Sequence, residues 1–84
     1  MKLTIGVKRT EPGIVNLTLH GPIDGETCTF LDSEVGKALT ESIRTLVLDM
    51  TGVDFVTSAG IGTIMKAKTS LARKKAELAL IGVQ

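Results

Sequence analysis

Two hydroxyl residues stand where an apolar segment gives way to a helical pattern. The stretch DFVTSAGIG, residues 54–62, places Thr57 and Ser58 after a Phe-Val pair that we expect to be buried, and before two glycines. The first turn of a helix has unpaired backbone N–H groups and a positive dipole end. Ser58 therefore either caps the helix, which the motif alone favours, or carries a phosphate. Gly60 and Gly62 are expected to leave the site uncovered, so that a partner's backbone can approach.

The same residues fit catalysis poorly. A nucleophilic serine needs a base within hydrogen-bond reach, and the single histidine, His20, lies at the expected end of the second strand. The G-x-S-x-G motif is absent because Val56 occupies the place of the first glycine. No Lys-Ser or Lys-Thr completes a phosphate-binding loop. A paired-carboxylate enzyme would need a further acid near Asp49 or Asp54, and nothing in the spacing requires one. An enzyme is thus the third interpretation, and it would require a pocket in which Asp49 converges with His20.

Composition narrows the class of protein further. The 84 residues suffice for one domain, and 43% hydrophobic with 23% charged residues is a globular composition. Two Phe and no Tyr or Trp offer few platforms on which bases could stack. The formal net charge of +1 argues against a general polyanion binder, although half of the ten Lys/Arg lie between Lys66 and Lys75. We expect no direct contact with nucleic acid.

Cofactor, metal and membrane roles are also disfavoured. One cysteine, Cys28, cannot form an internal disulfide, and one Cys with one His does not make a structural zinc site. No apolar run approaches the roughly 20 residues of a membrane helix. The N-terminus lacks a signal-peptide pattern. We expect a cytoplasmic protein that inserts into no membrane and needs no cofactor or metal.

Hydrophobic patterns predict six elements. Alternation indicates a β-hairpin, with strands over 3–7 and 14–20 joined by the turn EPG. A helix is expected over 26–40, with Asp24 as its cap and Glu26 and Asp32 near its positive end. The run TLVLDM, residues 45–50, is typical of a buried strand, and the last strand is expected over 78–83. Between them, a second helix is predicted by an apolar stripe of Ile61, Ile64, Met65, Lys68, Leu71 and Ala72.

The predicted order β-β-α-β-α-β defines an α/β fold. Strands that alternate with helices imply right-handed crossovers and parallel pairing of the last three strands. We expect a single domain over 1–84, with a mixed sheet and helices packed on it. The last strand has no obvious cover.

Residues 46–68 resemble the signature of the STAS domain, specifically of the bacterial anti-sigma-factor antagonists. The likeness rests on an apolar strand ending in Asp49, then Phe55, and then Ser58-Ala59-Gly60-Ile61-Gly62 before an amphipathic helix. An earlier segment, with Gly21, Ile23 and Asp24 after an apolar strand, is similar to a second family motif. In element order the likeness spans about residues 3–84.

The resemblance implies a regulator of transcription that works by partner switching. In that family the unphosphorylated protein binds an anti-sigma factor that is also a serine kinase, and so frees the sigma factor. Phosphorylation of the serine breaks the complex, and a serine phosphatase resets it. By resemblance Ser58 is the phosphate acceptor. The partner surface comprises Asp24, Thr57, Ser58, Ala59, Gly60 and Gly62.

Two differences from the family matter. Thr57 stands where the family usually has Asp, which adds a second candidate acceptor. Family members usually continue into another helix, which is absent here, so we expect marginal stability or self-association. The alternative function is a non-catalytic STAS subunit of a transporter or signalling assembly, in which Ser58 is only a helix cap.

Overall fold

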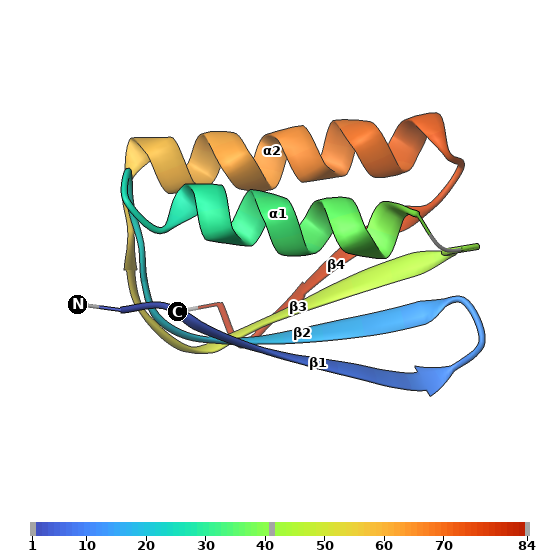
Figure 1. The fold of residues 1–84 in the computed structure, drawn as a ribbon, viewed down its shortest axis with the longest axis horizontal. Helices are drawn as coiled ribbons and strands as arrows, with labels where there is room; N and C mark the ends of the chain where they lie inside the picture. Colours follow the sequence, from blue (N-terminus) through green and yellow to red (C-terminus); the bar gives the residue numbers. More distant parts are fainter. Residues whose placement is uncertain (1, 41, 84) are drawn as a thin grey trace.

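A computed structural model describes residues 2–40 and 42–83. These residues form a four-stranded sheet and two helices (Figure 1). In chain order the elements are β1 (Thr4–Glu11), β2 (Ile14–Ile23), α1 (Cys28–Leu39), β3 (Thr45–Val56), α2 (Ser58–Arg73) and β4 (Glu77–Ile81). The order expected from the sequence is confirmed.

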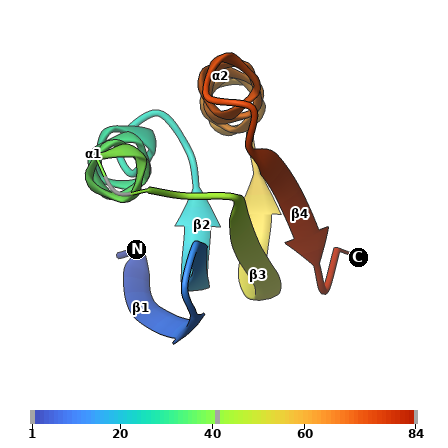
Figure 2. The ribbon, with the colours of Figure 1, turned by 90° about the vertical axis from the view of Figure 1, so that its right-hand side faces the viewer.

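The sheet is mixed, with its strands in the order β1-β2-β3-β4. β1 pairs antiparallel with β2, whereas β2, β3 and β4 run parallel, as predicted. Two crossovers of the same hand that step the same way across a sheet place their helices on the same face. Figure 2 shows this arrangement, with α1 over the β1–β2 side and α2 over the β3–β4 side. Among the described residues, the opposite face of the sheet carries no helix.

The core lies between the sheet and the helices. Alternate residues of β2 and β3 point toward the helices, because successive side chains of a strand lie on opposite faces. The most completely buried of the large core side chains are Leu17, Leu19, Ile23, Leu31, Leu46, Leu48 and Leu71. Each contributes about 1.5–3 kcal/mol by leaving water. An aliphatic core, as the composition requires, therefore supports the fold.

Both central strands are longer than predicted. β3 continues past residue 50 to Val56, and β2 continues past residue 20 to Ile23. Pairing persists through two register irregularities, with His20 opposite Gly52 and Ile23 opposite Val56. A parallel partner thus keeps these segments extended where the alternation of the sequence fails. The two strands end together beside the Thr57-Ser58 junction.

Other boundaries move by a few residues. α1 begins at Cys28 and ends at Leu39 rather than spanning 26–40, and β4 ends at Ile81 rather than residue 83. β1 runs from Thr4 to Glu11, past the predicted 3–7, into a hairpin turn where Gly13 has a φ of +83°. A side chain at Gly13 would be strained there, so glycine suits this turn.

The predicted buried face of α2 is only partly correct: Leu71 is buried and Ile64 is half-buried, but the other predicted positions are exposed. Its buried residues are Gly60, Ala67 and Leu71, with Ile64 half-buried between them. Ile61 and Met65, which the apolar stripe places in the core, are each 54% exposed. Small residues at 60 and 67 let the helix pack close to the sheet, and this choice of face leaves the larger side chains outside.

Candidate functional site

The junction between β3 and α2 is anchored to the end of β2. The Thr57 backbone N–H donates to the Ile23 carbonyl at 2.9 Å, and the Thr57 hydroxyl donates to the same oxygen at 3.5 Å. Thr57 Oγ1 also accepts from the Gly60 N–H at 3.4 Å. Thr57 is therefore the N-cap of α2, half-buried and used as both donor and acceptor.

The interpretation of Ser58 as the helix cap is wrong. Ser58 is the first residue of α2 and is exposed. Within residues 2–40 and 42–83, no side-chain hydrogen bond engages its hydroxyl. The two adjacent hydroxyls thus have different roles. Thr57 caps the helix, and the Ser58 oxygen stays accessible at the positive end of the helix dipole.

The two glycines of the motif have different roles. Gly60 is buried, and a Cβ built there would lie 2.5 Å from the Ile23 carbonyl oxygen and 2.8 Å from Val56 Cγ1. Gly60 therefore permits close packing of α2 on the strand ends, and the expectation that it leaves the surface open is corrected. At Gly62, by contrast, a Cβ would meet nothing within 4 Å. Gly62 and Ala59 are exposed, as a partner surface requires.

The loop before α1 is closed by its own hydrogen bonds. Asp24 Oδ1 accepts from the backbone N–H groups of Glu26 at 2.9 Å and Thr27 at 3.0 Å. The buried Thr27 hydroxyl donates to the Pro22 carbonyl at 2.8 Å and accepts from the Asp24 N–H at 2.9 Å. Donation from the Thr27 backbone, and then from that of Glu26, lowers the pKa of Asp24 below its ordinary value of 3.8.

Asp24 does not cap α1 as predicted. The N-cap position belongs to Thr27, and no acidic residue lies in the first turn of the helix, because Glu26 precedes the cap and Asp32 follows that turn. Asp24 instead holds the turn that precedes the helix, because its carboxylate bonds residues two and three positions ahead. The sequence thus identified Asp24 as a residue that stabilises this segment, but predicted that it caps the helix and not that it holds the preceding turn.

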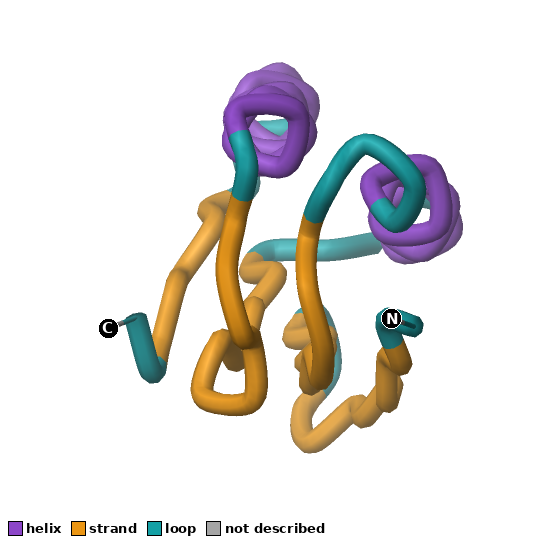
Figure 3. The backbone as a smooth tube through the Cα atoms, turned by 90° about the vertical axis from the view of Figure 1, so that its left-hand side faces the viewer, coloured by secondary structure: helices purple, strands orange, loops and turns teal. Residues whose placement is uncertain are grey.

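These two loops meet at one end of the molecule. The Ile23 carbonyl, directly before Asp24, receives the Thr57 N–H and so joins the entry to α1 with the entry to α2. Figure 3 shows both loops from this end. Asp24 and the Thr57-Ser58 pair, far apart in the sequence, thus lie at the same end of the molecule. We call the exposed set Ser58, Ala59, Ile61, Gly62 and Met65, together with the 24–27 loop, the switch surface.

Sequence reasoning missed the apolar part of this end. The pattern assigns Ile61 and Met65 to the core and predicts a buried Phe55, yet Phe55 is 48% exposed. Phe55 lines a shallow hollow with Met50, Val53, Asp54, Val56 and Val83. The spacing of Gly60, Ile64, Ala67 and Leu71 could have identified the true buried face, because it too follows one side of a helix.

The residues weighed for catalysis do not converge in a described pocket. His20 packs against Gly52, where a Cβ would lie 2.3 Å from its Nδ1. The pKa of Asp49 is lowered by hydrogen bonds from the hydroxyl and backbone N–H of Thr51, and by the nearby charge of His20. Asp49 and His20 are thus neighbours, but neither lines a described hollow. No hydrogen bond joins His20 to Ser58 within the described ranges.

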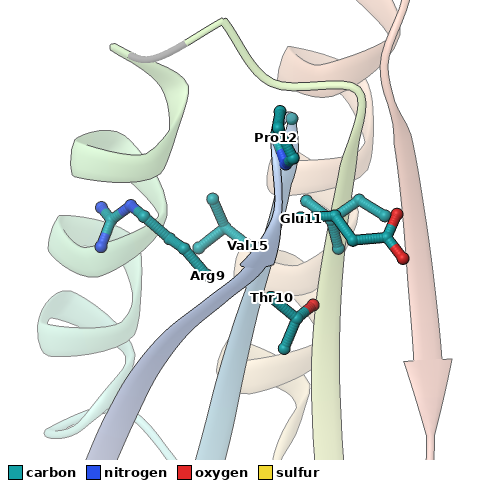
Figure 4. A pocket seen from close by; sticks show the side chains of 7 residues that line it. Arg9, Thr10, Glu11, Pro12 and Val15 are labelled. Atoms are coloured by element: carbon teal, nitrogen blue, oxygen red, sulfur yellow. The ribbon is translucent and has the colours of Figure 1, made fainter.

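A second hollow, possible metal ligands and possible membrane helices were also considered among the described residues. A hollow at the β1–β2 turn, lined by residues 9–15, includes none of the predicted site residues (Figure 4). Over residues 2–40 and 42–83, no group of three or more His, Cys, Asp or Glu is placed to hold a metal. Across the same residues, neither helix is long and apolar enough to cross a membrane.

The chain belongs to the STAS domain family, whose model matches residues 7–84. No curated protein matches it at the level of sequence. Among solved structures it is similar to an anti-sigma factor antagonist from Mycobacterium paratuberculosis, with a TM-score of 0.82 and 23% identity over 94% of this chain and 66% of that one.

Two further structures share the fold. The anti-sigma factor antagonist SpoIIAA, in its unphosphorylated form, gives a TM-score of 0.77 at 14% identity over 89% of this chain and 66% of that one. A murine Solute Carrier 26 anion transporter gives 0.78 at 22% identity, over 90% of this chain and 13% of that one. The chain thus spans just under two thirds of the two antagonists and a small part of the transporter.

Proposed function

We propose that this protein is an anti-sigma-factor antagonist that works by partner switching, with Ser58 as its phosphorylation site. One observation carries the proposal: Thr57 caps α2, and the adjacent Ser58 is exposed at the helix start with no structural hydrogen bond among the described residues. A kinase can then reach the Ser58 hydroxyl without disturbing the cap. The likeness to SpoIIAA, which has been solved in unphosphorylated and phosphorylated forms, supports the same class of function.

Ser58 is favoured over Thr57 as the acceptor. Thr57 is half-buried and its hydroxyl is shared between Ile23 and Gly60, so phosphorylation there would remove the cap. A phosphate on Ser58 would instead add about −2 charge beside N–H groups that face the end of the helix. Thr and Asp are both good N-caps, which accounts for Thr57 in place of the family's usual Asp.

The partner surface follows from the same geometry. Before phosphorylation the switch surface presents apolar Ile61 and Met65 beside small Ala59 and Gly62. An anti-sigma factor with serine kinase activity would bind this surface, and the new phosphate would repel it by charge and bulk. A serine phosphatase would restore binding. In this proposal the protein acts in the cytoplasm and catalyses nothing itself.

The test uses Ser58 variants as bait for the partner. Purified Ser58→Ala and Ser58→Asp chains are immobilised, and captured proteins are identified by mass spectrometry and assayed for ATP-dependent phosphorylation of the wild-type chain. We expect Ser58→Ala to retain a kinase that Ser58→Asp loses by tenfold or more, and we expect phosphate at Ser58 by peptide mapping. Thr69→Asp serves as the charge control, because Thr69 is an exposed hydroxyl residue on the same helix but far from its start.

The alternative is a STAS subunit of a transporter or signalling assembly, favoured by the likeness to the anion transporter. Its original premise, that Ser58 caps the helix, no longer holds because Thr57 is the cap. If Ser58→Ala and Ser58→Asp capture the same partners equally well, and no phosphate is found on either hydroxyl, this alternative replaces the switch.

A further inference from the structure

One buried hydroxyl lies behind both loops of the switch surface. Thr27 is a polar residue that is only 9% exposed. Its hydroxyl donates to the Pro22 carbonyl at 2.8 Å and accepts from the Asp24 N–H at 2.9 Å. The Asp24 carboxylate, 3.3 Å away, is a weaker alternative acceptor for the same proton. Because Thr27 presents almost no surface, it can affect a partner only through the residues that it holds.

The two hydrogen bonds of Thr27 lie on either side of Ile23. The Asp24 N–H and the Ile23 carbonyl belong to one planar peptide group, so a bond that fixes the N–H also fixes the direction of the carbonyl. The Pro22 carbonyl, held by the same hydroxyl, belongs to the preceding peptide group. The Ile23 side chain is fully buried between them. The Thr27 hydroxyl therefore sets the orientation of the Ile23–Asp24 peptide.

The carbonyl of this peptide anchors the start of α2. It accepts from the Thr57 N–H at 2.9 Å and from the Thr57 hydroxyl at 3.5 Å. Gly60 packs on the same oxygen, since a Cβ built there would lie 2.5 Å from it. Thr57 in turn accepts from the Gly60 N–H at 3.4 Å. The N-cap and the first turn of α2 thus depend on where the Ile23 carbonyl points.

We propose that Thr27 is a positioning residue of the switch surface. Its hydroxyl orients the Ile23–Asp24 peptide, this peptide holds Thr57, and Thr57 places the adjacent Ser58 hydroxyl. The inference rests on the proposed function, in which Ser58 accepts a phosphate. It adds to that function a buried residue that acts on Ser58 through its neighbours.

The connection between the two helix starts is short. Thr27 occupies the N-cap position of α1 and Thr57 that of α2, and one peptide group lies between them. The bonds at its two ends, from the Asp24 N–H to Thr27 and from the Thr57 N–H to Ile23, are both 2.9 Å, an ordinary hydrogen-bond length. We therefore expect the 24–27 loop and the Thr57-Ser58 junction to move as one unit.

Phosphoryl transfer is sensitive to such positioning. The Ser58 oxygen would form a bond to the γ-phosphorus of ATP as the bond to ADP breaks and the hydroxyl proton leaves. The oxygen must then lie in line and within about 3–3.5 Å of the phosphorus, and a misplacement of about 1 Å can cost about 100-fold in rate. Loss of the Thr27 hydroxyl should thus slow phosphorylation although Ser58 itself is unchanged.

Amide exchange in the isolated chain tests the anchoring of Thr57. Thr27→Val keeps the shape of the side chain but loses its hydrogen bonds. In this variant the Thr57 N–H should exchange at least about tenfold faster relative to the N–H of Leu48, a core residue of β3. Thr27→Ser, which keeps the hydroxyl, should restore the wild-type ratio.

Val15→Ala is the control for a general loss of stability, because Val15 is a core residue at the opposite end of β2. It should leave the exchange ratio of Thr57 to Leu48 unchanged. An unchanged ratio in Thr27→Val, or an equal change in Val15→Ala, would overturn the proposal.

The reverse direction decides the question if Thr27→Val does not fold. Coupling between two sites is reciprocal, so Thr57→Val should speed exchange of the Asp24 N–H relative to that of Leu48. Thr63→Val is the matched control, because the Thr63 hydroxyl bonds the Ala59 carbonyl within α2 and not the Ile23 peptide. An Asp24 N–H that responds to neither variant, or equally to both, would contradict the connection.

The step from Thr57 to Ser58 is tested with the kinase captured by the Ser58→Ala chain. Thr27→Val should lower kcat/KM for phosphorylation of Ser58 by about tenfold or more, chiefly through kcat, and Thr27→Ser should recover it. If Thr57 loosens but kcat does not change, Thr27 does not position Ser58. If no kinase phosphorylates the wild-type chain, the proposed function fails, whereas the exchange ratio still decides whether Thr27 anchors the junction.

Discussion

The two helices begin side by side, but the loops that lead into them are stabilised by different hydrogen bonds. At the entry to α1, the Asp24 carboxylate and the buried Thr27 hydroxyl take part in five hydrogen bonds within six residues. At the entry to α2, the side-chain bonds among the described residues are those of Thr57, and Ser58 is left exposed. The loop before α1 is closed by its own hydrogen bonds, whereas the start of α2 leaves the Ser58 hydroxyl exposed. The contrast shows that a hydroxyl at a helix start stays accessible when its neighbour is the cap, and the proposed phosphorylation of Ser58 requires this accessibility.

The largest expected effect on stability comes from comparing the buried and the exposed glycine of α2. Gly60→Ala forces a Cβ against the Ile23 backbone oxygen, 2.5 Å away, so the helix must shift; overpacking of this kind costs about 1–3 kcal/mol or more. Gly62→Ala is the matched control, because its Cβ meets nothing within 4 Å and alanine favours a helix by about 1 kcal/mol. Urea unfolding should show opposite signs. Equal effects would mean that Gly60 is not packed as described.

The next effect compares the two threonines. Thr27→Val leaves the Pro22 carbonyl and the Asp24 N–H without their buried partner, which costs about 1–3 kcal/mol. Thr57→Val removes a half-buried cap and costs about 1 kcal/mol. Ser58→Ala, at an exposed position, should stay within about 0.5 kcal/mol. Free energies of unfolding from urea melts rank the three. A loss at Ser58 as large as at Thr57 would restore the serine as a structural cap.

Much of the fold was predictable because its signals are local. Alternation predicted the first two strands, a continuous apolar run predicted β3 and helical spacing predicted α1, so the order and the parallel pairing follow from the sequence. The extension of β3 to Val56 was not predictable, since pairing with β2, and not its own pattern, keeps that segment extended. The buried face of α2 was mispredicted because hydrophobicity favoured Ile61 and Met65, whereas close packing selects Gly60 and Ala67.

The site was predictable in its residues but not in their roles. Thr57 and Ser58 are adjacent hydroxyls, and either type can cap a helix. Which one does so depends on the Ile23 carbonyl, thirty-four positions away in the sequence, which fixes Thr57 at the end of the strand. A long-range contact of this kind cannot be predicted from the local sequence motif.

The smallest expected effect concerns acid and the closed turn. Donation from the Thr27 and Glu26 backbones lowers the pKa of Asp24, so the folded chain binds this proton less tightly than the unfolded chain does. The ionised carboxylate therefore stabilises the fold above its ordinary pKa of 3.8, and this contribution is lost as pH falls toward the lower folded value. We expect the stability difference between wild type and Asp24→Asn to shrink between about pH 6 and about pH 3.

Asp49→Asn is the control for that measurement, because the pKa of Asp49 is also lowered but by Thr51, on β3. In Asp49→Asn, the contribution of Asp24 to the pH dependence of the free energy of unfolding should remain. Each single variant should therefore remove only the contribution of its own carboxylate. If wild type and Asp24→Asn differ equally at both pH values, the charge of the Asp24 carboxylate is not what stabilises the turn. The α2 entry, which has no acidic residue in its first turn, should show no matching dependence when Thr57→Val is compared with wild type over the same range.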